Sequence, residues 1–115
     1  MRVGVTSTPD GRVGGGLGRA QTMAVADVRD GSIASWSEIE VGWGDLHGTG
    51  TEGSHHARIV RFVREHALET VVTSGLGESM RTTMGKLGVA VRTDLAGDAR
   101  DAAVTAASTT PMPLP

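Results

Sequence analysis

The sequence predicts a single α/β domain with a five-stranded mixed sheet, antiparallel in its first half and parallel in its second. Three observations support this fold class. The length of 115 residues suits one domain. An Asp30-Gly31 pair separates two stretches that alternate as strands do. Two later short strands flank a helical segment, which is the order of a βαβ unit. About three helices are expected to cover this sheet.

The first strand is predicted at Arg2 to Thr6, where Val3 and Val5 alternate with smaller residues. It ends at the turn Thr8-Pro9-Asp10-Gly11, because Pro presets φ and Gly permits positive φ. The next passage, Val13-Gly14-Gly15-Gly16-Leu17-Gly18-Arg19-Ala20, contains too many glycines for a helix or strand. It is therefore expected to be a loop.

A β-hairpin is predicted from Met23 to Val41. Asp30-Gly31 suits the type I′ turn, which joins the strand from Met23 to Val28 to the strand from Ile33 to Val41. In the second strand, strict alternation predicts one apolar face and one mixed face. The apolar face would carry Ile33, Ile39 and Val41, and the other Trp36, Glu38 and Glu40.

A long irregular segment is expected from Gly42 to Gly53, and loops of this length in small domains are often functional. Ser54 is predicted to cap a helix that runs to Ala67. Its spacing predicts a sheet-facing side made of His56, Ile59, Val60, Val63 and Ala67.

The second half follows the βαβ order. The expected elements are a strand at Thr70 to Thr73, a turn at Ser74-Gly75-Leu76-Gly77, a helix at Glu78 to Leu87, a strand at Val89 to Arg92 and a helix at Asp98 to Ala107. The first of these helices should bury Met80, Met84 and Leu87, and the second Ala99, Ala102, Ala103 and Ala106. The domain is thus expected to span residues 1–107, with a flexible, Pro-rich tail at 108–115.

Composition narrows the possible functions. The net charge of −2 provides no basic stripe for nucleic acid, and the absence of Cys excludes disulfides and thiolate ligands. No stretch is long and apolar enough to predict a signal peptide or a membrane span. We therefore expect a cytoplasmic protein, either monomer or homodimer, that binds neither nucleic acid nor membrane.

Two glycine-rich loops are candidate ligand sites. The first is not a dinucleotide fingerprint, because a G-x-G-x-x-G motif from Gly14 would need glycine where Arg19 stands. Its glycines either contact a ligand or only let the chain cross between strands. The second loop, Ser74 to Gly77, follows a strand and opens a helix, a geometry that favours an anion. Tight packing alone is the other explanation.

Three histidines cluster near the middle of the chain. His47, His55 and His56 lie close in sequence to Asp45 and Glu52, which indicates a possible metal site. His55 and His56 are about 100° apart around a helix, so another residue would have to complete the site. The alternative for His56 is a buried core position.

These passages resemble the dinitrogenase iron-molybdenum cofactor biosynthesis family over most of residues 1 to 106. The matching positions are Leu17, Gly18, Arg19 and Ala20 in the first loop and Ser74, Gly75, Leu76 and Gly77 in the second. The resemblance implies a ribonuclease-H-like three-layer fold without nuclease activity. It also implies a carrier of iron-molybdenum cofactor or its iron-sulfur precursor. The family loop often has a histidine where this chain has Gly16.

We therefore expect a non-catalytic binding protein that contacts a metallocluster or another small anionic ligand. Gly18, Arg19, Ser74, Gly75 and Gly77 are the predicted ligand-binding residues, with Arg19 supplying charge unless it is a structural salt-bridge partner. His47, His55 and His56 are the predicted metal ligands.

Two other functions are compatible with the sequence. One is a regulatory module that binds a partner protein without metal, using Trp36 and Trp43 as exposed anchors. The other is a metal-dependent hydrolase built on Asp45, His47 and Glu52. Strand one carries no carboxylate, and no nucleophile and base are evidently paired, so catalysis is not expected.

Overall fold

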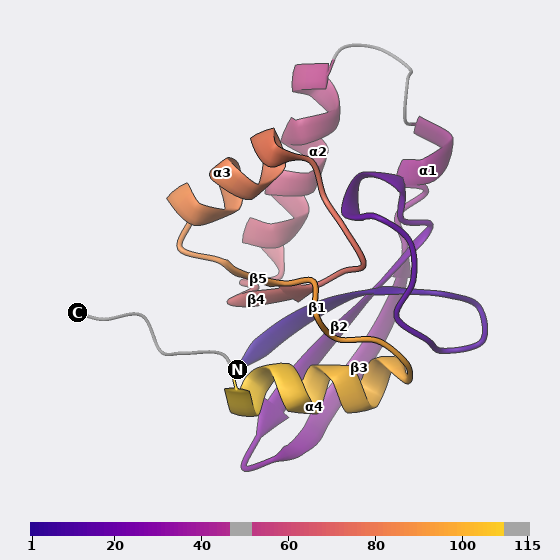
Figure 1. Cartoon of the computed structure of the whole chain (residues 1–115), viewed down its shortest axis with the longest axis vertical. Coiled ribbons are helices and arrows are strands. Elements are labelled where there is room, and N and C mark those ends of the chain that lie inside the picture. The colour runs from indigo at the N-terminus through magenta and orange to yellow at the C-terminus, as the bar shows by residue number, and fades with distance from the viewer. Residues whose placement is uncertain (47–51, 110–115) are drawn as a thin grey trace.

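The computed structural model describes residues 1–46 and 52–109, which form one five-stranded sheet. Its strands are β1 (Arg2–Ser7), β2 (Thr22–Arg29), β3 (Ser32–Glu40), β4 (Thr70–Val72) and β5 (Ala90–Arg92). They lie in the order β3-β2-β1-β4-β5 (Figure 1). The β3-β2-β1 half is antiparallel, whereas β1, β4 and β5 are parallel. The predicted mixed sheet is confirmed.

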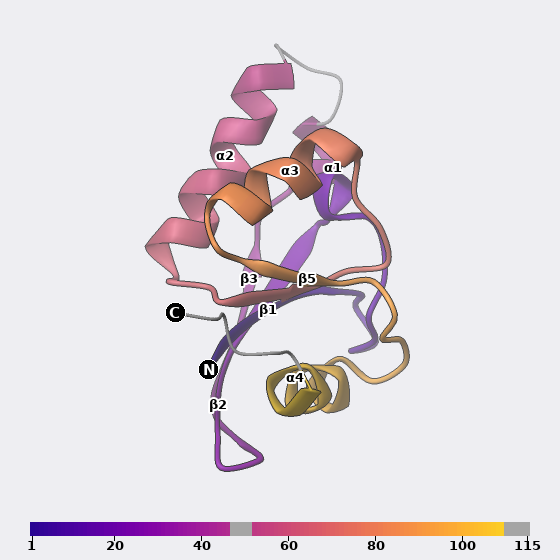
Figure 2. The same cartoon turned by 60° about the vertical axis from the view of Figure 1, so that its left-hand side comes forward.

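Helices cover both faces of this sheet. They are α1 (Trp43–Leu46), α2 (Glu52–Glu65), α3 (Glu78–Lys86) and α4 (Ala99–Thr109), and a short 3-10 turn, η1 (Leu17–Arg19), lies within the first glycine loop. Helices α2 and α3 pack on one face and α4 on the other, as Figures 1 and 2 show together. This arrangement is the expected ribonuclease-H-like three-layer fold. The one-turn helix α1 was not predicted.

Each face has its own core. On the α2/α3 face the buried side chains are large, and they include Leu17, Met23, Trp43, Ile59, Phe62, Met80 and Met84. On the α4 face the buried hydrophobic residues of the described chain are valines and alanines, with the predicted Ala99, Ala102, Ala103 and Ala106 among them. Within the described residues, every helix is too short or too polar to cross a bilayer.

The hairpin between β2 and β3 has the predicted turn, because Asp30 and Gly31 both have positive φ, at 52° and 78°. The predicted face of β3 is wrong at one end. Asp27 pairs with Ser35 but Val28 pairs with Ile33, so β3 carries one extra residue, a β-bulge. The bulge reverses the alternation. Ile33 therefore packs beside Trp36 in the α4 core, while Ile39 and Val41 pack on the opposite face.

Two helix ends differ from the prediction. Helix α2 begins at Glu52, so Ser54 lies inside it instead of capping it, and Ala67 lies beyond its end with a φ of 51°. Helix α4 continues to Thr109, so the predicted tail does not begin at residue 108. Residues 110–115 of that tail lie outside the described part of the chain.

The end of α4 is attached to the edge of the sheet. Arg92 donates to Thr109 Oγ1 at 2.7 Å and binds both carboxylate oxygens of Asp94, at 2.9 and 2.8 Å. These bonds from the guanidinium lower the pKa of the Asp94 carboxyl below its ordinary value.

Candidate ligand pocket

The two glycine-rich loops meet at one edge of the sheet. They follow β1 and β4, which are neighbouring parallel strands, so their carboxyl ends lie together. Leu17 N–H donates to the Gly75 carbonyl at 2.9 Å, and Ser74 N–H to the Gly15 carbonyl at 3.3 Å. From this point the chain turns toward β2 on one side and β5 on the other. Open α/β sheets bind ligands at such switch points.

Three hydroxyl groups surround the Gly15 carbonyl and hold the loops together. Ser74 Oγ donates to this oxygen at 2.5 Å, and the hydroxyls of Thr73 and Thr6 lie 3.3 and 3.4 Å from it. Thr73 Oγ1 is also 3.1 Å from the Gly75 carbonyl. Both threonines are fully buried. Hydrogen bonds shielded from water in this way fix the relative position of the two loops.

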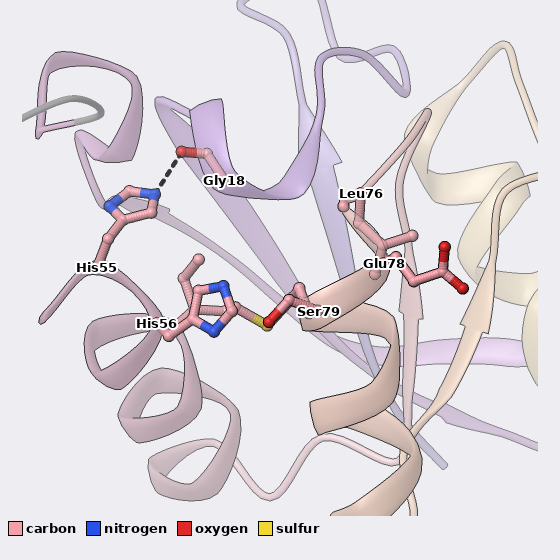
Figure 3. Close-up of a pocket in the computed structure, with 9 residues that line it drawn as sticks. Gly18, His55, His56, Leu76, Glu78 and Ser79 are labelled. Carbon is pink, nitrogen blue, oxygen red and sulfur yellow. Dashed lines mark hydrogen bonds between the residues drawn. The ribbon is translucent and has the colours of Figure 1, made fainter. Parts of the chain in front are cut away.

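A pocket of about 270 Å³ opens beside this junction, between η1, α2 and the start of α3 (Figure 3). Its volume is near the lower limit for small-ligand sites. Its apolar wall consists of Ile59, Leu76 and Met80. Its polar side chains are His55, His56, Glu78 and Ser79, and glycines 18 and 77 complete the lining.

The first turn of α3 borders the pocket. Gly77, the residue before the helix, is extended and caps it with no side chain. The backbone N–H groups of a first helical turn have no partner within the helix, and the helix dipole is positive at this end. The helix end that borders the pocket, from Gly77 to Ser79, therefore has the polarity that favours a negatively charged group.

The two adjacent histidines lie differently from the prediction. His55, not His56, is on the buried side of α2, with 9% of its surface exposed. Its Nε2 is 2.7 Å from the Gly18 carbonyl, and its Nδ1 is 3.3 Å from Arg58 Nη1. His56 is half-buried and lines the pocket, and its ring points toward Ser79 (Figure 3). His47 lies outside the described residues.

The predicted ligand-binding residues separate into two groups. Gly18 and Gly77 line the pocket. Ser74 and Gly75 lie at the loop junction instead, and the Arg19 side chain is exposed and is not part of the lining. Sequence reasoning did not propose Ile59, Glu78, Ser79 or Met80 as site residues. The helical spacing that predicts burial of Ile59 and Met80 could have indicated these two residues as part of the pocket wall.

The tryptophans do not form the exposed anchors that a protein-binding module would need. Trp43 is 3% exposed and packs edge-on against Phe62, with ring centroids 5.3 Å apart. Trp36 is half-buried beneath the Arg100 guanidinium, 4.7 Å from the ring centroid. Trp43 is therefore not the exposed anchor that this alternative expected, and Trp36 is only partly accessible.

The proposed hydrolase group is only partly described. Asp45 is exposed and accepts a hydrogen bond from Gln21 Nε2 at 3.1 Å. His47 and the Glu52 side chain lie outside the described part. In residues 1–46 and 52–109, no three His, Asp or Glu side chains come close enough together to hold a metal ion.

Comparison with known proteins agrees with this architecture. The structure is similar to that of a protein described as PH0822, with a TM-score of 0.71, 22% identity, and coverage of 92% of this chain and 88% of that one. It is also similar to TM1290 from Thermotoga, described as NifB-like and of the DUF35 family. Here the TM-score is 0.68 and the identity 23%, over 95% of this chain and 88% of that one.

No curated protein matches the chain. A protein-family model described as "Dinitrogenase iron-molybdenum cofactor" matches residues 1–109, which is nearly the whole sequence. The chain therefore belongs to the dinitrogenase iron-molybdenum cofactor family.

Proposed function

We propose that this protein is a non-catalytic carrier that holds a metallocluster, or another small anionic ligand, in the pocket between η1, α2 and α3. Family membership supports a role related to iron-molybdenum cofactor. The observation that carries the more specific proposal is the convergence at one pocket of Gly18, the His56 imidazole and the first turn of α3. The cargo would be iron-molybdenum cofactor or an iron-sulfur precursor.

The available donor atoms suit a preformed cluster better than a single ion. A mononuclear zinc site takes about four protein or water ligands, whereas the described part of the chain brings no three such side chains together. A cluster carries most of its own ligands as sulfide. One imidazole from His56 and one soft thioether from Met80, both pocket-lining, could then suffice. Without Cys, the attachment would be reversible, as a carrier requires.

The absence of catalysis is part of the proposal. A histidine acting as general base is usually oriented by a third group, often a carboxylate. The carboxylate among the described lining residues belongs to Glu78, and it points away from both histidines (Figure 3). We expect His56, which lines the pocket, to take part in binding the ligand.

Anaerobic titration tests the proposal. The purified protein would be titrated with a synthetic iron-sulfur cluster capped by thiolates and, separately, with ferrous iron and zinc, while metal content and thermal stability are measured. A ligand that prefers the native state stabilises it, by about 2.7 kcal/mol at a concentration 100 times Kd. We expect stabilisation by the cluster and weak binding of the single ions.

The matched variants are a His47/His55/His56 triple alanine and His66→Ala, which changes a histidine that does not line the pocket. Binding should be lost in the first and kept in the second. Equally weak cluster binding by the native protein and the triple variant would refute the carrier function.

A further inference from the structure

The outer side of α2 carries a row of residues separate from the side that packs on the sheet. The sheet-facing side is buried and includes Ile59 and Phe62. The outer row follows the spacing i, i+3, i+4, i+7, so its members share one face of the helix. It consists of Ala57, Val60, Arg61 and Arg64. This row, called here the outer stripe, extends about 10 Å along the helix axis.

The outer stripe is open to solvent. Ala57, Arg61 and Arg64 are exposed, and Val60 is half-buried. Figure 2 shows α2 at the outside of the molecule, with no described element beyond it. Although Val60 is apolar, it belongs to neither of the two cores. The stripe therefore presents apolar contact area beside two arginines, a combination that is typical of protein interfaces.

The two arginines of the stripe have no carboxylate partner. Within residues 1–46 and 52–109, neither guanidinium forms an ion pair. Glu65 is the one carboxylate whose side chain is described on α2, and it pairs with neither of them. The chain as a whole has a net charge of −2, so α2 is locally positive on a negative protein. A negatively charged partner would be attracted to this helix and repelled by the chain as a whole.

We propose that the outer stripe binds an acidic, amphipathic helix of a partner protein. Carboxylates three or four residues apart on a helix are about 5–6 Å apart at their Cβ atoms, which is also the spacing of Arg61 and Arg64. Arginine binds carboxylates through paired hydrogen bonds and keeps its charge at physiological pH. Apolar side chains of the partner helix would pack on Val60, and the small Ala57 lets its backbone approach.

Nucleic acid fits this surface less well than an acidic protein. Strong binding to the phosphate backbone takes about 6–10 contacts, whereas the stripe offers two guanidiniums. It also has no aromatic ring on which a base could stack. The stripe lies on the helix that supplies Ile59 to the pocket, so the partner would dock beside the pocket. The inference does not depend on which ligand the pocket holds.

A synthetic peptide provides the probe. It is an amphipathic helix with glutamate and leucine at the spacing i, i+3, i+4, and a scrambled peptide of the same composition is its control. Fluorescence anisotropy with the full chain measures binding at about 0.15 M salt, where charges more than about 8 Å apart are largely screened. We expect saturable binding of the helical peptide, at least about 10-fold tighter than that of the scrambled one.

Two double variants with the same change in net charge test the surface. Arg61→Glu/Arg64→Glu should weaken binding of the peptide more than about 10-fold, because like charges then face each other. Arg12→Glu/Arg100→Glu reverses two exposed arginines beside α4, on the other face of the sheet, and should change binding less than about 3-fold. If thermal denaturation shows that the first variant does not fold, Arg61→Gln/Arg64→Gln removes the charge without reversing it and should also weaken binding.

Three results would overturn the inference. They are equal losses in the two charge-reversed variants, equal affinity for the helical and scrambled peptides, and tighter binding of a short DNA duplex than of the helical peptide. The cluster titration uses no peptide, so failure of the docking surface and failure of the carrier function are distinguishable.

Discussion

The two faces of the sheet are packed with side chains of different size. The buried hydrophobic residues described beneath α4 are valines and alanines, whereas leucine, methionine, isoleucine, phenylalanine and tryptophan fill the space beneath α2 and α3. Small side chains let a helix approach the sheet closely, and larger ones hold helices away from it. The pocket lies on the second face, where two residues of that core, Ile59 and Met80, form part of its wall. The α4 face thus stabilises the sheet, whereas the α2/α3 face both stabilises the sheet and forms part of the pocket.

Truncation of a large side chain on the α2/α3 face should lower the stability of the protein most. Met84 is fully buried, so Met84→Ala should lower the free energy of unfolding by about 2–5 kcal/mol through lost burial and a residual cavity. Arg81→Ala, at an exposed position of the same helix, is the control and should change it by less than about 0.5 kcal/mol. Urea denaturation measures both. A loss below about 1 kcal/mol for Met84→Ala would mean that this face collapses around cavities.

Enlargement of a side chain on the α4 face should cause the next largest loss of stability. Ala103 is fully buried between α4 and the sheet, so Ala103→Leu should cost about 1–3 kcal/mol by overpacking. Thr105→Leu places the same side chain on the exposed side of the helix and should cost little. If both variants are equally stable in urea, the α4 face is not as closely packed as its composition indicates.

Loss of one hydroxyl at the loop junction should lower the stability of the protein less than the two core substitutions do. Its effect on ligand binding at the pocket should be larger than theirs. Thr73→Val keeps the side-chain shape and removes a buried hydroxyl within reach of two loop carbonyls, at an expected cost of about 1–2 kcal/mol. Binding of the cluster probe should weaken as well, because the loops that carry Gly18 and Gly77 are less firmly joined. Thr93→Val, at an exposed position, is the control. Unchanged binding in Thr73→Val would show that the junction does not shape the pocket.

Adjacent glycines of the first loop should respond differently to substitution. Gly15 has a φ of 75°, which costs an L-residue about 1–2 kcal/mol. Gly16 is extended, with φ −79° and ψ 156°, and an added Cβ would meet only the Gly75 carbonyl, at 3.4 Å. Thermal denaturation should therefore show a loss for Gly15→Ala and almost none for Gly16→His, which restores the histidine frequent in the family. Strong destabilisation by Gly16→His would mean that the junction with Gly75 tolerates no side chain.

The parts of the fold with strong local signals could be predicted from the sequence. The turn chemistry of Asp30-Gly31 and the alanine spacing of α4 each depend on a few neighbouring residues, and both predictions are confirmed. The bulge in β3 could not be predicted, because it depends on pairing with β2 and leaves no mark in composition.

The orientation of α2 was ambiguous for a different reason. Ile59 and Val63 can belong to either of two helical faces. One of these faces also contains His56 and Val60. The other contains His55 and Phe62. Periodicity alone cannot choose between them. The burial of Phe62 and the hydrogen bond from His55 to Gly18 select the second face, and both involve residues far away in the sequence. The candidate site was therefore predicted at the level of its loops and helix, but the positions of its two histidines were not.

The bulge in β3 has a further consequence at the outer edge of the sheet. A long, regular edge strand offers evenly spaced backbone groups on which another chain can add a strand and begin to aggregate. Ala34 interrupts that spacing, and Glu38 and Glu40 place exposed negative charge along the same strand. The irregularity that moves Ile33 into the α4 core thus also protects the open edge of the sheet from uncontrolled self-association.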